Sequence, residues 1–159
     1  MTDKLSSSAQ RVQDTLVGLG YTNQVVEHEQ TTRSAREAAQ AIGCSVAQIV
    51  KSLIFRTQES HRPVLVLASG PNRVNEARLG ELVTEAIERA DPDFVQAVTG
   101  FAIGGVPPVG HRSAMMTFID EDLMQHPEIW AAAGTPNAVF KLTPAEMAAM
   151  TGGQVVNIK

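Results

Sequence analysis

The chain has 159 residues, of which 43% are hydrophobic and 19% charged, and its formal net charge is −4. This size suits one globular domain with its own core, so we expect residues 1–159 to form a single domain. The acidic balance excludes broad, salt-driven wrapping of nucleic acid, and seven aromatic residues are too few for a platform that stacks several bases. We expect no DNA partner, although gripping one end of an RNA remains compatible with this charge.

The cysteine content and the amino terminus limit the compartment and the chemistry. Cys44 is the single cysteine, so an internal disulfide is impossible and no zinc ligand set is available. The first ten residues lack the apolar run of a signal peptide, and no later window has the length and apolarity of a membrane span. We expect a cytoplasmic protein with no membrane partner, no metal and no cofactor.

In the first half of the chain, periodicity and capping residues predict both helices and strands. In chain order these are a helix from the Ser8 cap to Gly20, a strand over Asn23–His28, and a helix from the Ser34 cap, with Glu37 in a capping box, to Gly43. Ser45 and Gln48 repeat the cap signal, after which helical VAQIVK changes to extended SLIFRT. The apolar run Pro63–Ala68 then predicts a central hairpin with SLIFRT, buried on both faces.

The second half predicts the same mixture of elements. We expect a helix over Asn75–Val83, a helix from Asp91 to Gly100, a strand over Met115–Ile119 and a helix over Glu121–Ala133 ended by Gly134. These are followed by a strand over Ala138–Leu142, a helix from the Thr143–Pro144–Glu146 capping box to Gly152, and a strand over Gln154–Ile158. Without strict βαβ alternation, we expect an α+β fold around a mixed, curved sheet. Rossmann, P-loop, GxSxG, HExxH and EF-hand patterns are missing from the sequence.

The stretch VTGFAIGGVPPVGHR, residues 98–112, concentrates the unusual backbone of the chain. It holds Gly100, Gly104, Gly105, Gly110, Pro107 and Pro108. Glycines permit turns that side chains forbid, and prolines fix them. Such a loop is either a pre-organised set of N–H donors for an anion or a polarised carbonyl, or a tight crossover between two elements.

Lys51 and the histidines each allow a structural and a functional interpretation. Lys51 precedes a strand predicted to be buried, so it is either a phosphate or carboxylate anchor or an exposed boundary lysine. His111 adjoins the loop and either contacts substrate or caps the turn. We expect His28, His61 and His126 to be structural or on the surface, because none has a second ligand at a useful spacing.

Three segments together carry a resemblance to a known family. IVKSLIF around Lys51, TGFAIGGVPPVGH about fifty residues later, and GTPNAVFKLTPAEM near the carboxyl end occur in the matching order and spacing. With these segments the chain resembles the YbaK/ProX family of prolyl-tRNA synthetase-associated editing domains, from about His28 to the end. The resemblance implies a partly barrel-like sheet and the hydrolysis of mischarged aminoacyl-tRNA carrying a small amino acid.

The resemblance also implies roles for particular residues. The N–H groups of Gly104, Gly105 and Val106 would face the ester carbonyl, and Lys51 would contact the terminal nucleotide or its phosphate. The implied substrate-binding residues are Thr31, Thr32, Pro107, Pro108, Gly110, His111, Gly134 and Thr135. The vicinal ribose hydroxyl would help to activate water, which accounts for the missing Ser/His/Asp set.

The implied partners are the acceptor end of an aminoacyl-tRNA and an aminoacyl-tRNA synthetase. Related members often carry an acidic residue at the position of Asn75. If that acidic residue helps to place the substrate, this chain differs from them in specificity. An alternative stays open, in which the protein is a non-catalytic tRNA- or nucleotide-binding accessory module of a synthetase. This alternative predicts saturable binding without turnover.

Overall fold

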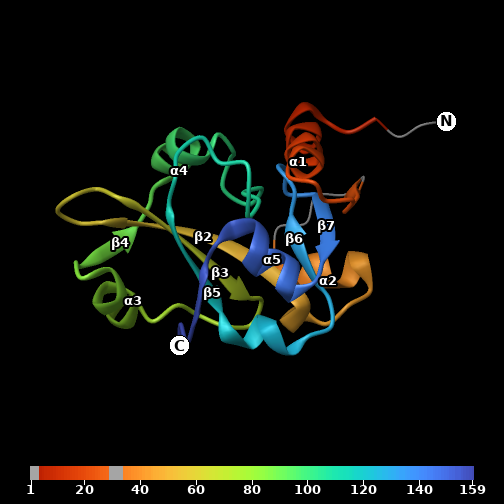
Figure 1. Cartoon of the computed structure of the whole chain (residues 1–159). Helices are drawn as coiled ribbons and strands as arrows, with labels where there is room; N and C mark the ends of the chain where they lie inside the picture. Colours follow the sequence, from red (N-terminus) through yellow and green to blue (C-terminus); the bar gives the residue numbers. More distant parts are fainter. Residues whose placement is uncertain (1–3, 29–33) are drawn as a thin grey trace.

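The computed structural model describes residues 4–28 and 34–159. In this part of the chain, five α-helices, two 3-10 helices and eight strands follow one another (Figure 1). The helices are α1 (Ser7–Gly18), α2 (Ala35–Ile42), η1 (Val46–Gln48), α3 (Glu76–Val83), α4 (Pro92–Thr99), η2 (Glu121–Gln125) and α5 (Pro144–Thr151). The strands are β1 (Val25–Glu27), β2 (Ile49–Thr57), β3 (Pro63–Ser69), β4 (Ile87–Arg89), β5 (Met116–Asp120), β6 (Ile129–Ala132), β7 (Ala138–Leu142) and β8 (Gln154–Val156).

All eight strands belong to one mixed sheet. Its order is β1-β7-β6-β2-β3-β5-β8, and β4 pairs with β2 beside this path. The pairs β2–β6, β3–β5 and β5–β8 are parallel, and the other pairs are antiparallel. The order has two ends, so the described sheet is not closed into a barrel. The predicted α+β fold with a mixed sheet and a central β2–β3 hairpin is confirmed.

The sheet buries side chains on both faces, and β2 alternates between them. Val50 and Ile54 join a core formed with α1, α4, α5 and the loop after α4, which we call the α4 face. Phe55 joins a second core with α3 and β4, which we call the α3 face, and Leu53 packs against it. Because neighbouring side chains of a strand point to opposite sides, the side chain of Ser52 lies on the α4 face of β2 and that of Lys51 on the α3 face.

Most of the predicted helix ends are confirmed. Ser34, Asp91 and Thr143 accept hydrogen bonds at the N-termini of α2, α4 and α5, and Gly43, Gly100 and Gly152 end these helices with left-handed backbone. Asn75 caps α3, a role that an aspartate performs equally well.

The predicted Ser8 cap of α1 is wrong, because Ser6 is the cap. The carboxylate of Glu27 accepts from both the N–H and the hydroxyl of Ser6, each at 2.8 Å. Three consecutive serines offer three caps to the first turn, and a contact with a distant strand selects one of them.

The helix predicted over Glu121–Ala133 is wrong as well. One 3-10 turn, η2, ends at Gln125, and β6 occupies Ile129–Ala132 between β2 and β7. Pro127 removes a backbone donor and disfavours helical geometry at the residue before it. Buried and half-buried residues alternate along IWAA, so these residues serve as a strand with one face in the core.

Smaller differences concern the ends of strands. Lys51 lies inside β2 rather than before it, because only η1 precedes the strand and β2 begins at Ile49. The three-residue strand β4 was not predicted from the sequence, and β8 ends at Val156 instead of Ile158.

Asp120 joins the end of β5 to the turn after β3. Its side chain is fully buried, and Oδ2 accepts from the Ser69 N–H at 2.9 Å and from Asn72 Nδ2 at 2.8 Å. Oδ1 accepts from the N–H of Asp122 at 2.9 Å. Both oxygens therefore face donors, and the carboxylate fixes the turn that holds Asn72.

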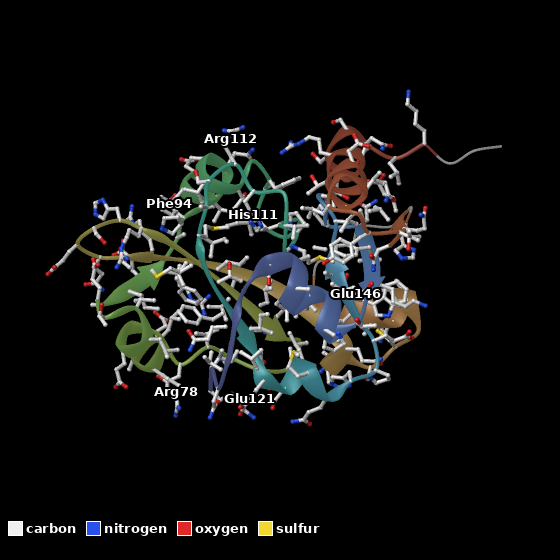
Figure 2. The ribbon with its side chains drawn as sticks, in the orientation of Figure 1. Arg78, Phe94, His111, Arg112, Glu121 and Glu146 are labelled. Atoms are coloured by element: carbon white, nitrogen blue, oxygen red, sulfur yellow. The ribbon has the colours of Figure 1, made fainter. Side chains whose placement is uncertain are left out.

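Asp120→Asn tests this arrangement, because in either orientation the new amide points N–H groups at an existing donor. We expect the free energy of unfolding to fall by about 3 kcal/mol, measured by urea denaturation. Glu121→Gln is the matched control at the next, exposed position (Figure 2), where a change within about 0.5 kcal/mol is expected. Equal stability of the two variants would contradict the role given to Asp120.

Candidate functional site

The loop after α4, residues 100–112, is pinned at both of its ends. The N–H of Arg112 donates to the Thr99 carbonyl at 3.1 Å, and the N–H of Ser113 donates to the Val98 carbonyl at 2.8 Å. These bonds return the chain to the end of α4, so the loop closes on itself beside α1 (Figure 1). We call residues 100–112 the glycine loop.

His111 closes the far part of the glycine loop. Its Nε2 lies 2.6 Å from the carbonyl oxygen of Pro107, which can only accept, so Nε2 carries the proton. Burial lowers the pKa of His111, and the bond to Pro107 opposes this shift only in part. In Figure 2 His111 lies beneath the loop, while the neighbouring Arg112 points outward. The hydrogen bond corresponds to the turn-capping interpretation of His111.

Two glycine corners, from the glycine loop and from the turn after β6, meet in direct backbone contact. The Gly134 N–H donates to the Gly105 carbonyl at 2.8 Å. A Cβ atom on Gly105 would lie 2.8 Å from the Gly134 oxygen, and one on Gly134 would lie 2.5 Å from the Ser8 oxygen. Gly134 also has φ +100°. Only glycine allows this approach, which locks the loop against β6 and α1.

A cavity of about 170 Å³ lies between the glycine loop and β2. Its lining residues are Ser52, Leu53, Ile54, Phe55, Arg89, Ala90, Val95, Ile103, Gly104 and Val106. At about 30 Å³ for each water molecule, the cavity has room for roughly six waters, which is the scale of a small amino acid. A wider groove of about 670 Å³ between the N-terminal segment, α1 and β1 contains none of the predicted site residues.

Two of the three predicted loop residues line this cavity. Gly104, in left-handed backbone with φ +92°, and Val106 are lining residues, and within residues 4–28 and 34–159 their N–H groups have no hydrogen-bond partner. The Gly105 N–H instead donates to the Ala102 carbonyl at 3.0 Å. The Gly105 N–H thus closes a turn, whereas those of Gly104 and Val106 stay available, and the role expected for the three residues stays a prediction.

Lys51 is half-buried on the α3 face and does not line the cavity. Its Nζ donates to the carbonyl oxygen of Asn72 at 2.7 Å, in the turn held by Asp120. In the described residues no carboxylate forms an ion pair with Lys51. An ammonium group has three N–H donors, so two remain for another acceptor.

Two arginines, Arg73 and Arg89, act electrostatically on Lys51. Burial lowers the pKa of Lys51, the positive charges of Arg73 and Arg89 lower it further, and Asp120 acts in the opposite direction. Arg89 also lines the cavity and forms a 3.8 Å ion pair with Glu76. We call Lys51, Arg73 and Arg89 the cation group, of which Arg89 lines the cavity.

The remaining predicted residues support the glycine loop or lie elsewhere. Pro107 and Pro108 are buried within it, and a Cβ on Gly110 would lie 3.1 Å from Thr15 of α1. Thr135 Oγ1 lies 3.1 Å from Glu27 Oε2 and the same distance from Asn137 Oδ1, behind the corner formed by Gly134. Thr31 and Thr32 lie outside the described residues.

Sequence reasoning missed two polar lining residues, Ser52 and Arg89. Ser52 follows Lys51, and the alternation of side chains along a strand would have placed Ser52 on the face of the strand opposite to Lys51. Arg89 ends the unpredicted strand β4, and the sequence carried no usable signal for it.

Similarity to known proteins extends over most of the chain. The family model described as "Aminoacyl-tRNA editing domain" matches residues 29–150. The chain belongs to the aminoacyl-tRNA editing domain family. This confirms the family expected from the three sequence segments. In the described part of the chain, no helix combines the length and apolarity needed to cross a membrane.

Two proteins and one solved structure resemble the chain over most of its length. "Uncharacterized protein YwhH" of Bacillus subtilis is 29% identical over 84% of both chains. "Putative Cys-tRNA(Pro)/Cys-tRNA(Cys) deacylase EbsC" of Enterococcus faecalis is 25% identical over 79% of this chain and 76% of its own. A solved structure named "Crystal structure of a putative trans-editing enzyme for prolyl tRNA synthetase" is 48% identical, with a TM-score of 0.93 over 98% of this chain and 99% of that one.

Gly105→Ala tests the contact between the two glycine corners. The added Cβ meets backbone atoms of Gly134 and Thr135 at 2.8 Å, so β6 and the loop must separate, and we expect a loss of about 2 kcal/mol in urea denaturation. Gly18→Ala in α1 is the control, because its Cβ meets nothing within 4 Å. A stable, unperturbed Gly105→Ala protein would contradict the close contact.

The lowered pKa of His111 predicts that the stability of the protein depends partly on pH. Since its pKa is lowered in the folded state, the unfolded chain binds the proton first as pH falls below about 6.5. The free energy of unfolding therefore has its full value above that pH. It decreases as the pH falls toward the pKa of His111 in the folded protein. Between pH 7 and pH 5 the urea midpoint should fall further for the wild type than for His111→Gln. Parallel curves would contradict the prediction.

Proposed function

We propose that this protein is a trans-editing hydrolase that removes a small amino acid from a mischarged tRNA. The observation that supports the proposal most strongly is a cavity lined by Gly104 and Val106, whose amides lack a partner in the described residues, and by Arg89 of the cation group. An aminoacyl ester and the terminal nucleotide of a tRNA need both features, donors for the ester carbonyl and cations for a phosphate. Family membership adds independent support.

In this proposal the acceptor end lies along the edge of β2. The aminoacyl group enters the cavity, the ribose lies at its mouth, and a phosphate meets Lys51, with Arg89 between the two sites. This placement accommodates the position of Lys51 on the α3 face, because the lysine needs to reach the nucleotide and not the carbonyl. Phosphate would replace water around the two remaining ammonium protons.

The chemistry is the addition of water across the ester. The water oxygen bonds to the carbonyl carbon, the bond to the ribose oxygen breaks, and one water proton ends on that oxygen. The N–H groups of Gly104 and Val106 would stabilise the oxyanion between these steps, and a lost donor of this kind typically reduces kcat by about a hundredfold or more. The vicinal ribose hydroxyl would assist the proton transfer, since Arg89 is the single titratable residue in the described part of the lining.

The lack of a carboxylate or histidine in the described lining also favours a second function. In that case the protein binds an aminoacyl-tRNA, as an accessory of a synthetase, without hydrolysing it. Assays on tRNAs charged with alanine, serine, threonine or cysteine separate the two functions. Release of an amino acid above the buffer rate supports the hydrolase, whereas saturable binding without release supports the accessory module.

Lys51→Met tests the role of the lysine while conserving much of its volume. We expect kcat/KM to fall by about ten- to a hundredfold, because charge-assisted hydrogen bonds are lost. The fall should lie mainly in KM, since a phosphate remote from the carbonyl is bound equally in the ground and transition states.

Lys141→Met on β7 is the matched control. Lys141 is an exposed lysine that lies 3.6 Å from Glu128, away from the cavity lining. Its loss should change kcat/KM by less than twofold. If both variants behave alike, Lys51 does not anchor the substrate.

A further inference from the structure

The edge of β2 that faces the cavity has a gap in its strand pairing. On this side β6 pairs with β2 at Ile49 and Val50, and β4 pairs with it from Phe55 onward. Residues 51–54 therefore lack a strand partner there in the described sheet. The Ile54 carbonyl accepts from the Ala90 N–H at 3.3 Å, so alternation directs the main-chain groups of Ser52 toward the same edge.

The hydroxyl of Ser52 is buried at this gap without a hydrogen-bond partner. In the described residues three buried side-chain polar atoms lack a partner, and Ser52 Oγ is the one that belongs to a cavity-lining residue. Other buried hydroxyls are bonded. Ser69 Oγ donates to the Ala47 carbonyl at 2.7 Å, and Thr99 Oγ1 donates to the Val95 carbonyl at 2.7 Å.

An unpaired buried hydroxyl is destabilising, so its presence in a cavity points to a ligand group that bonds to it. The rest of the lining narrows the choice of that group. Most of it is apolar, which suits an alkyl carbon, and its charged member is Arg89. With a cation and no carboxylate among the lining residues, the cavity suits the neutral side chain of an aminoacyl group, whose α-ammonium would stay at the mouth beside the ribose. A neutral side chain with one hydroxyl fits both surfaces.

We propose that Ser52 is a specificity-determining residue that hydrogen-bonds the side-chain hydroxyl of a seryl ester in this cavity. The inference rests on the proposed function, because it names the aminoacyl group that the same site selects. An alanyl group has almost the same shape but would leave Ser52 unpaired. A polar site discriminates against an analogue that lacks the bonding group in this way. One neutral hydrogen bond predicts a preference of about three- to tenfold.

Binding of two stable analogues tests the proposal without requiring turnover. The probes are adenosines that carry a seryl or an alanyl group on a 3′-amide, and calorimetry measures their dissociation constants. The wild type should bind the seryl analogue about three- to tenfold more tightly. Ser52→Ala should bind both analogues equally, with its alanyl affinity unchanged within about twofold.

Ser113→Ala is the control at an exposed serine that the cavity lining does not include. It should retain the seryl preference of the wild type. The proposal is overturned if the wild type has no seryl preference, if neither analogue binds, or if the preference survives in Ser52→Ala.

Turnover of seryl- and alanyl-tRNA separates this inference from the proposed function. A Ser52-dependent binding preference without hydrolysis would reject the hydrolase and retain the role of Ser52. Hydrolysis of both esters with equal kcat/KM, together with equal binding of the analogues, would retain the hydrolase and reject the role of Ser52.

Discussion

The pairing of β2 is the constraint on which the site depends. β3 pairs with β2 from Val50 to Arg56, whereas β6 and β4 hold only the two ends of the opposite edge. One side of the strand is therefore paired along its length, and the other leaves residues 51–54 without a strand partner in the described sheet. Since side chains alternate along a strand, this short opening places Ser52 and Lys51 on opposite faces at one edge.

The glycine loop faces this edge because backbone contacts hold it there. Gly105 and Gly134 meet at a distance that excludes any Cβ atom, and Gly134 lies still closer to Ser8. The His111 bond to Pro107 and the two bonds at the ends of the loop remove further freedom. Amides fixed in this way need little reorganisation when charge develops nearby, which is the property that oxyanion stabilisation requires.

Local signals in the sequence predicted much of the fold, and contacts between distant segments account for what it missed. Caps such as Ser34, Asp91 and Thr143 act within one turn of their helices, so a short window contains the necessary information. The cap at Ser6 depends on Glu27, and β6 depends on the strands on either side of it. For the site, the glycine loop and Lys51 stood out by composition and resemblance. The importance of Ser52 follows from strand register, which no single segment contains.

The proposed function requires the aminoacyl group to lie at the open edge of β2. A crystal structure with a non-hydrolysable 3′-aminoacylamido-adenosine 5′-phosphate tests this most directly. The account predicts the carbonyl oxygen within hydrogen-bonding distance of the Gly104 and Val106 amides, and the phosphate beside Lys51. A ligand bound in the groove between α1 and β1, with the cavity beside β2 empty, would contradict it.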